Sequence, residues 1–322
     1  MEDLEDEDLI PEEKVVVTLT ADGYVKKVPE DEYRAQGRGG RGVIGIQPKE
    51  EDFVVDIFVC STHDNIFVFS NLGRVYWMKG YNIPSTSRYA KGKAIVNLLS
   101  MKQDERVTDM IPVSDFSQKG FLVIATKNGL VKKTSLSAYS KPRKGGIIGC
   151  LLREGDEVIE AKLTSGTDEI IIGTAHGKAI RFPESQVRPM GRNTTGVRGI
   201  KLKKGDEAIS MATVNKDATL LSVTENGFGK RTLVSAYPLQ NRGGQGVLDI
   251  KTNERNGPVI AIRDVSDTHN LMLTTNDGII IKIPVDSISV VGRNTMGVIL
   301  IKVKEHQKLA AVTRISYEED GE

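Results

Sequence analysis

Residues 15–28 read Val15-Val16-Val17-Thr18-Leu19-Thr20-Ala21-Asp22-Gly23-Tyr24-Val25-Lys26-Lys27-Val28, two β-branched runs on either side of an Asp-Gly pair. A primed turn needs positive φ, which Gly adopts at low cost, so this stretch predicts a β-hairpin. The same unit recurs around Leu72-Gly73, Asn128-Gly129, His176-Gly177, Asn226-Gly227 and Asp277-Gly278. The turn glycines are 50, 56, 48, 50 and 51 residues apart, which makes a six-fold repeat.

Each repeat has a second fixed glycine, 19 residues after the turn glycine in five repeats and 17 residues after it in the third. These loop glycines are Gly42, Gly92, Gly146, Gly196, Gly246 and Gly297. A short apolar segment follows each of them, at 43–46, 95–98, 147–151, 197–202, 247–250 and 298–303. A longer one closes each repeat, at 54–59, 107–113, 158–163, 208–214, 259–265 and 309–315. The sequence therefore predicts four strands per repeat and no helix.

Six units of about 50 residues, each a four-stranded antiparallel sheet, have the period of radial β architectures. One small sheet cannot bury both of its faces, so each sheet is expected to pack against its neighbours. We predict an all-β fold, a six-bladed β-pinwheel formed by residues 14–316. The sequence leaves open whether the blades form a closed ring or a shallow spiral, and how many strands neighbouring blades exchange.

The composition is that of a core-forming chain of one large or two ordinary domains, with 322 residues, 39% hydrophobic and 27% charged. The two cysteines, Cys60 and Cys150, have no CxxC or Cys/His spacing, which favours a reducing cytoplasm and argues against disulfides or a zinc site. No apolar run approaches the roughly 20 residues that span a bilayer, and the acidic amino terminus is unlike a signal peptide. We expect a soluble, cytoplasmic protein without membrane contact.

Negative charge is concentrated at the two ends of the chain. Residues 1–13 hold eight acids and residues 317–322 hold four, with no Lys or Arg in either segment. The interior therefore has 44 basic residues against 31 acids, a net charge of +13. The acidic leader and tail are interpreted either as solvated linkers or as internal competitors for the basic body of the domain.

Cations recur at equivalent positions of the repeats. Four residues after the turn glycine stand Lys27, Lys133, Arg181, Arg231 and Lys282, with Trp77 in the second repeat. One residue earlier stand Lys26, Lys132 and Lys230, and four residues before the loop glycine stand Arg38, Arg88, Arg192, Arg242 and Arg293. Lys91 and, in the third repeat, Arg143 and Lys144 complete the set. Because a strand has a period of two, fixed offsets put these side chains on equivalent faces, and a circular belt of cations predicts a wrapped polyanion.

The sequence favours duplex DNA as that polyanion. Aromatic residues make up only 5% of the chain and none recurs in register as a stacking platform, which argues against single-strand binding. No element presents the Asn, Gln and Arg set typical of base-edge readout, so little sequence specificity is expected. Bending about 40 base pairs through a half-turn costs on the order of 10 kcal/mol, so many phosphate contacts must act together.

The loop of the first repeat, Gln36-Gly37-Arg38-Gly39-Gly40-Arg41-Gly42, is the richest in glycine and arginine. With the six repeats and the basic strands, it makes the chain resemble the C-terminal domain of the A subunit of bacterial DNA gyrase, over nearly its whole length. The signature box of that family reads Gln-Arg-Arg-Gly-Gly-Arg/Lys-Gly. Here Gly37 replaces one arginine, which puts one box cation in doubt and leaves the other six positions matched.

This resemblance implies a function. The domain would wrap duplex DNA around its rim with a defined handedness and present it to the cleavage core, which enables negative supercoiling. The box would steer the wrap and tie the first blade to the last. The implied partners at the nucleoid are the gyrase B subunit and the breakage-reunion part of this domain's own polypeptide, and the isolated domain would be a monomer. The related domain of topoisomerase IV, the main alternative, usually has fewer blades and a degraded box.

The sequence indicates no catalysis by this chain. Its four histidines, His63, His176, His269 and His306, have no metal-ligand spacing, and no GxxxxGK[ST] motif is present, so neither a metal, a cofactor nor ATP use is expected. The resemblance implies that the DNA-cleaving tyrosine lies upstream. Two other hypotheses are a propeller that binds proteins through its central face and an enzyme with its site in a central channel; loops rich in Arg, Lys, Gly and Asn favour neither.

Overall fold

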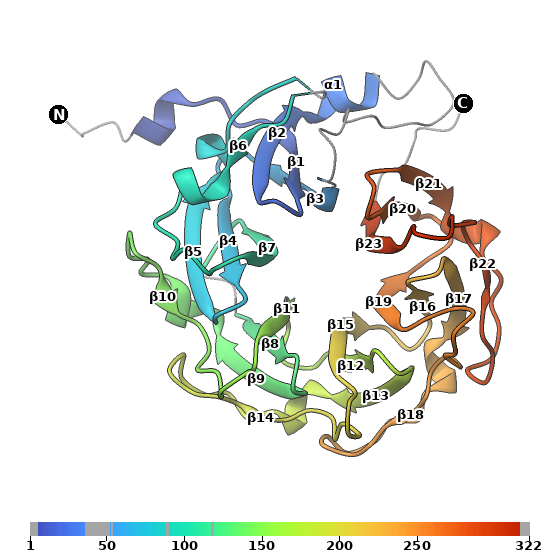
Figure 1. The fold of residues 1–322 in the computed structure, drawn as a ribbon. Coiled ribbons are helices and arrows are strands. Elements are labelled where there is room, and N and C mark those ends of the chain that lie inside the picture. The colour runs from blue at the N-terminus through green and yellow to red at the C-terminus, as the bar shows by residue number, and fades with distance from the viewer. Residues whose placement is uncertain (1–5, 36–51, 53, 88–89, 117–118, 316–322) are drawn as a thin grey trace.

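Six antiparallel β-sheets follow one another around a central channel (Figure 1). The computed structural model describes residues 6–35, 52, 54–87, 90–116 and 119–315. Each sheet is one blade of a propeller, and its strands run in order from the channel to the outer edge. In the described part of the chain, five blades have four strands and the sixth has three.

The two middle strands of each blade form the predicted hairpin. The pairs are β1 (Lys14–Thr20) and β2 (Tyr24–Pro29), β4 (Asn65–Ser70) and β5 (Arg74–Lys79), β8 (Phe121–Thr126) and β9 (Leu130–Ser135), β12 (Glu169–Thr174) and β13 (Lys178–Pro183), β16 (Thr219–Thr224) and β17 (Phe228–Leu233), and β20 (Asn270–Thr275) and β21 (Ile280–Pro284).

The first hairpin differs from the expected two-residue primed turn. Three residues, 21–23, separate its strands, Gly23 has φ +81°, and its N–H donates to the Thr20 carbonyl, the pattern of a three-residue hairpin loop.

The strand nearest the channel comes from the end of the same repeat, as predicted. These inner strands are β3 (Val54–Ser61), β7 (Val107–Val113), β11 (Val158–Thr164), β15 (Ala208–Val214), β19 (Val259–Val265) and β23 (Leu309–Ile315). Each pairs with the first strand of its hairpin and carries one register shift near its start. This irregularity is a β-bulge, which increases local twist and bends a strand around a closed ring.

The outermost strand of each of the first five blades is supplied by the next repeat, a point that the sequence left open. These strands are β6 (Lys93–Ala94), β10 (Ile147–Ile148), β14 (Val197–Arg198), β18 (Val247–Leu248) and β22 (Val298–Ile299). They are two residues long, so the longer strands predicted there are wrong. In the second repeat the predicted strand 95–98 is instead the 3₁₀ helix η4 (Ile95–Asn97). One strand per blade is therefore exchanged between neighbours.

The two fixed glycines of the repeat are needed for this exchange. A Cβ on the turn glycine Gly177 would lie 2.1 Å from the carbonyl oxygen of Ile250 in the next repeat. A Cβ on the loop glycine Gly246 would lie 2.4 Å from the carbonyl oxygen of Ala179 in the preceding blade. Both glycines also have positive φ. Close backbone approach and backbone conformation together explain why the pattern repeats glycine at these two points.

Short helices occur in the described chain, which corrects the prediction of none. One α-helix, α1 (Glu30–Ala35), follows β2. The 3₁₀ helices are η1 (Asp6–Leu9), η3 (Gly80–Asn82), η4, η5 (Leu136–Tyr139), η6 (Glu184–Gln186), η7 (Val234–Ala236) and η8 (Val285–Ser287). Most of them follow a hairpin directly and turn the chain toward the neighbouring blade.

The hydrophobic core lies between blades. Five clusters of ten to twelve buried residues fill the contacts from the first blade to the sixth. A smaller cluster, Val16, Val54, Ile57, Met272 and Ile280, joins the sixth blade to the first, where β23 also packs beside β3. The blades therefore form a closed ring, and among the described residues its seam has the smallest buried core.

Residues 6–13 are attached to the ring rather than separated from it. Glu7 contacts the Lys79 ammonium at 3.0 Å through both carboxylate oxygens. The carbonyl oxygens of Ile10 and Pro11 accept hydrogen bonds from His63 and Thr62, at 2.7 and 2.9 Å. This part of the predicted acidic leader packs on the junction between the first two blades. Residues 1–5 and the predicted tail 317–322 lie outside the described residues.

Candidate nucleic-acid interface

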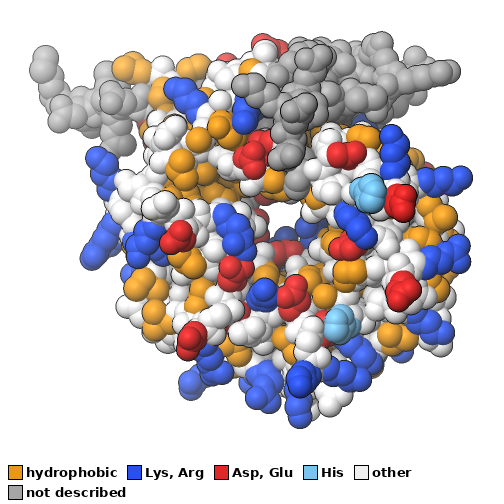
Figure 2. All heavy atoms as spheres, viewed as in Figure 1, with side chains coloured by type: hydrophobic (Ala, Val, Ile, Leu, Met, Phe, Trp, Pro, Cys, Tyr) orange, Lys and Arg blue, Asp and Glu red, His pale blue; other side chains and the backbone are white. Residues whose placement is uncertain are grey.

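The outer edge of the ring is almost free of acids. Five segments contain the outer strands and their loops: 83–101, 140–153, 187–204, 237–251 and 288–304. We call these the rim segments. They hold eighteen Lys and Arg residues and one acid, Asp249, whose side chain is buried. Figure 2 shows Lys and Arg side chains spaced around the outer margin of the molecule. Because no exposed acid of the described rim segments interrupts them, these cations give that part of the rim a positive potential.

The recurring cations four residues after the turn glycine are not an exposed belt, and that prediction is wrong. Lys133, Arg181 and Arg231 are buried, and Lys27 and Lys282 are half-buried. Their side chains bond to the next repeat: Lys27 to the Gly80 and Tyr81 carbonyls, Lys133 to that of Glu184, Arg181 to those of Val234 and Tyr237, and Arg231 to that of Ile288. These cations recur because the contact between blades recurs.

The cations one residue earlier are more deeply buried. Lys26, Lys132 and Lys230 are 3%, 1% and 0% exposed, and their ammonium groups bond to backbone carbonyls. Burial lowers the pKa of Lys132 and of Lys230 to about 8. In this structure these side chains do not reach the surface, so the prediction that they lie in an exposed belt is also wrong.

The arginines before the loop glycines are half-buried and link neighbouring repeats. Arg192, Arg242 and Arg293 donate from Nη1 to the carbonyl oxygens of Ile148, Arg198 and Leu248, the second residue of the outer strand in the preceding repeat. Each therefore lies at the rim and holds an exchanged strand in place. Arg88 and the box Gln36–Gly42 lie outside the described residues, so their predicted roles stay predictions.

Three predicted cations are exposed at the rim. Arg143 and Lys144 are exposed in the loop before β10. Lys91 is exposed before β6, and its ammonium lies 3.8 Å from the centroid of the Tyr24 ring. A cation stacked on an aromatic ring is held in one position without a carboxylate partner.

The sequence interpretation missed most exposed cations of the rim. They are Lys93, Lys141, Arg153, Arg188, Arg198, Lys201, Lys203, Lys204, Lys251, Lys302 and Lys304. These residues do not recur at fixed offsets, so a search for matching positions passes over them. What these cations share is that the segments around them have almost no acids. That feature is visible in the sequence.

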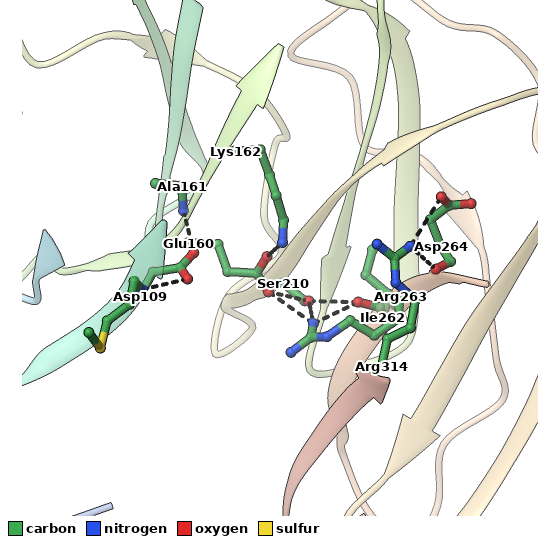
Figure 3. Close-up of polar contacts among 10 residues, drawn as sticks. Asp109, Glu160, Ala161, Lys162, Ser210, Ile262, Arg263, Asp264 and Arg314 are labelled. Carbon is green, nitrogen blue, oxygen red and sulfur yellow. Dashed lines mark hydrogen bonds and ion pairs between the residues drawn. The ribbon is translucent and has the colours of Figure 1, made fainter. Parts of the chain in front are cut away.

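The central channel has a different character. A cavity of about 1250 Å³ is lined by all six inner strands. Its charged side chains bond across blades (Figure 3). Glu160 of β11 accepts from Ser210 of β15 at 2.7 Å and from Arg263 of β19 at 3.0 Å. Lys162 lies 3.4 Å from the same carboxylate. Seven acids and five Lys or Arg residues line the cavity, so it lacks the excess of cations found in the rim segments.

Two channel carboxyls titrate unusually. Burial, followed by repulsion from Asp109, raises the pKa of Asp56 to about 7, with Lys162 and Arg263 opposing the shift. Burial also raises the pKa of Asp109 to about 6; Lys162 and Arg263 oppose this shift and Glu160 adds to it. The folded protein therefore binds protons that the unfolded chain, with an ordinary Asp pKa, has released. Stability from these groups is fully present below about pH 4, the ordinary Asp pKa, and is lost as pH rises from there through about 6 to 7.

We expect Asp56→Asn to leave the free energy of unfolding nearly unchanged at pH 4 and to raise it by about 2 kcal/mol at pH 8, since one pKa unit corresponds to about 1.4 kcal/mol and the channel admits water. Urea unfolding at the two pH values measures this difference. An equal effect at both values would show that Asp56 is ionised throughout.

Among the described residues, no group of three or more His, Cys, Asp or Glu side chains is placed to hold a metal ion. No helix in the described ranges is long and apolar enough to cross a bilayer.

The structure thus defines a class: a six-bladed propeller with exchanged outer strands, a basic rim and a channel without an excess of cations. The sequence profile described as "DNA gyrase C-terminal domain, beta-propeller" matches residues 14–61, 64–114, 120–165, 168–215, 218–266 and 269–316, one match per repeat. The chain belongs to the DNA gyrase C-terminal domain family, which confirms the resemblance drawn from the sequence.

Known proteins agree with this assignment. The DNA gyrase A protein of Staphylococcus aureus (strain MRSA252) is 48% identical over 324 aligned positions, which cover all of this chain and 37% of that protein. A solved structure of a DNA gyrase A C-terminal domain superposes with a TM-score of 0.79, at 27% identity over 94% of this chain and 99% of that one. The C-terminal domain of a DNA topoisomerase IV gives 0.78, also at 27% identity, over 95% and 94%. The chain spans little more than a third of the length of its gyrase relatives.

Proposed function

We propose that this domain binds duplex DNA around its rim, without sequence specificity, and bends the DNA as part of a DNA gyrase A protein. The observation that carries this proposal is the set of rim segments, in which the one acid is buried among eighteen cations. A ring with a positive outer edge and a channel without such an excess of cations offers DNA a curved path around it rather than through it.

The geometry also explains how a bend would be held. The described outer strands form the outer edge of five successive blades, and each of the five rim segments has exposed cations. Because bending a half-turn of DNA costs on the order of 10 kcal/mol, no single blade could hold it, whereas contacts added over five or six blades could. Backbone phosphates are the same in every sequence, so this mode of binding selects curvature and charge rather than bases.

In the whole enzyme, such a bend would present a DNA segment to the upstream part of the polypeptide that cleaves it and so support negative supercoiling. Catalysis would belong to that upstream part and to the gyrase B subunit. This domain would act as a non-catalytic module at the bacterial nucleoid in the cytoplasm. The isolated domain is expected to be a monomer.

The test uses relaxed closed-circular DNA. The domain is bound at increasing ratios, topoisomerase I relaxes the free writhe, and the topoisomers are separated after the protein is removed. We expect a shift in linking number that grows with the amount of bound protein, and an affinity that falls steeply with salt. Salt-sensitive binding without a shift would leave a basic ring that does not wrap DNA. No binding at low salt would favour the protein-binding scaffold instead.

A further inference from the structure

Three buried lysines occupy one position in alternate repeats. Lys26, Lys132 and Lys230 each stand three residues after the turn glycine, in the first, third and fifth repeats. The second, fourth and sixth repeats have Tyr76, Ile180 and Ile281 there. A buried ammonium is costly unless its three N–H groups are bonded, so its presence at a position where isoleucine also fits needs a specific partner.

Lys132 and Lys230 bond to carbonyl groups at equivalent positions of their repeats. Lys132 donates to the carbonyl oxygens of Gly149 and Arg192. Lys230 donates to those of Asp249 and Arg293, the latter at 2.8 Å, and also to that of Gly292 at 2.9 Å. Gly149 and Asp249 each stand three residues after a loop glycine. Arg192 and Arg293 are the arginines four residues before the loop glycine of the next repeat. Each ammonium therefore joins an outer strand to the following rim loop.

Lys26 has the corresponding place in the first blade. Its ammonium donates to the Ala90 carbonyl at 2.7 Å and lies 3.4 Å from that of Ser87. Both carbonyls belong to the rim loop of the second repeat. In the rim loops of the second, fourth and sixth repeats, backbone carbonyls thus accept hydrogen bonds from a buried lysine ammonium.

The other described rim loops are held differently. In the third repeat, Gly146 packs against the ring of Tyr76, and the guanidinium of Arg74 donates to the carbonyls of Gly145 and Gly146 from the half-exposed edge. In the fifth repeat, Arg242 donates from its backbone N–H to the side-chain oxygen of Gln186 at 2.7 Å and from Nε to the Gln186 carbonyl at 3.2 Å. Among the five described rim loops, those with a buried ammonium therefore alternate with those without one.

The ammonium fixes the arginine of its loop at the main chain. Arg192 is bonded through its carbonyl oxygen to Lys132 and through its guanidinium to the Ile148 carbonyl. Arg293 is bonded in the same way to Lys230 and to the Leu248 carbonyl. A side chain tied at both ends has little freedom to follow a ligand, so it sets the position that the ligand must take.

We propose that Lys26, Lys132 and Lys230 are positioning residues that fix the rim loops of alternate repeats and so set the path of DNA at three points, each two blades from the next. This inference rests on the proposed function. The lysines act through the loop backbone and do not themselves contact phosphate.

The first experiment does not involve DNA. Hydrogen exchange is followed in the wild type, in Lys132→Met and in Lys230→Met. We expect exchange to become about tenfold faster in residues 190–196 of the first variant and 291–297 of the second, and to stay unchanged in residues 241–246 of both. Unchanged exchange in the loop above the replaced lysine would overturn the proposal. Lys132→Gln provides a second variant if the methionine variant does not fold.

The second experiment separates positioning from contact. At saturating protein, we expect Lys132→Met to trap roughly a third less writhe than the wild type, because one of the three fixed points of the curve is lost. The slope of log affinity against log salt should stay within about 0.3 of the wild type. A slope lower by about 0.9 would mean that Lys132 contacts a phosphate, and would overturn the proposal.

The matched control is Ile180→Met, which makes an apolar exchange at the same position of the fourth blade. We expect it to leave loop exchange, writhe and salt slope unchanged, with all variants folded at the assay temperature by circular dichroism. Equal writhe in Lys132→Met and the wild type would show a merely structural role. If the wild type itself trapped no writhe, the proposed function would fail while the exchange experiment still tested the lysines.

Discussion

We expect the joint replacement of Arg143, Lys144 and Arg198 by alanine to lower the affinity of the domain for duplex DNA about 100-fold at 0.15 M salt. The three side chains are exposed, lie in two adjacent rim segments, and form no hydrogen bond or ion pair within the described chain that their loss would break. Each phosphate contact contributes about 0.9 to the slope of log affinity against log salt, so we expect the slope to fall by about 2.7. The melting temperature should not change, because exposed substitutions of this kind stay within about 0.5 kcal/mol.

The control variant removes the same charge from elsewhere. Lys14, Lys119 and Lys216 are exposed and lie outside the rim segments, so their joint replacement by alanine changes the net charge by the same three units. We expect it to lower the affinity less than about threefold and to leave the slope unchanged. Fluorescence anisotropy with a 40-base-pair duplex over a salt series measures both quantities. Equal losses in the two variants would mean that DNA responds to net charge alone, and the rim would lose its special role.

The hairpins and inner strands were predicted closely because their signals are local. A turn glycine fixes where two β-branched runs meet, and the last apolar segment of each repeat has only one adjacent strand edge to join. The inner strand predicted at 208–214, for example, is β15 as observed. Four of the five described outer strands begin where the sequence placed them, whereas β6 precedes its predicted segment; their predicted lengths were wrong, and the blade that each strand joins was left open. Val197 pairs with Val131 of the preceding repeat, and nothing in the local pattern distinguishes that pairing from one within its own repeat.

The candidate site was predicted in part, and the error has a physical cause. Equivalent positions in a repeat serve both the ligand and the contact between repeats, so recurrence alone does not separate the two. Lys132 and Lys133 recur because a neighbouring blade offers carbonyl oxygens at those points. Arg198 does not recur, yet it is exposed at the rim. Charge averaged over a segment predicts a surface better than charge at a fixed offset does.

Asp249 shows the limit of that averaging. As the one acid of the rim segments, it reads in sequence as a break in the positive surface, but its side chain is 1% exposed. Its carboxylate accepts hydrogen bonds from Ser222 at 2.8 and 3.0 Å and from Tyr237 at 2.5 Å. Its own backbone carbonyl accepts from the Lys230 ammonium. Burial raises the pKa of this carboxyl, and its hydrogen bonds from Tyr237 and Ser222 and the charge of Lys230 oppose that shift, so the group belongs to the core and does not reach the surface.

We therefore expect Asp249→Ala to lower the free energy of unfolding by about 3 to 5 kcal/mol, since it leaves the Lys230 charge uncompensated and the Ser222 and Tyr237 hydroxyls without an acceptor. For a domain of this size the melting temperature should fall by about 10 °C. Differential scanning calorimetry measures the change. Asp249→Asn should lose less, because it keeps the shape and one acceptor oxygen.

Asp217→Ala is the control for charge, because Asp217 is exposed in a turn and its loss should cost less than about 0.5 kcal/mol. Removing either acid makes the domain more positive by one unit. If Asp249 lay at the surface and repelled DNA, its removal would raise the affinity for DNA and leave the free energy of unfolding unchanged. A stable Asp249→Ala variant that binds DNA more tightly would therefore place this carboxylate at the surface. A destabilised variant that binds DNA as the wild type does, below its melting temperature, would place it in the core as the partner of Lys230.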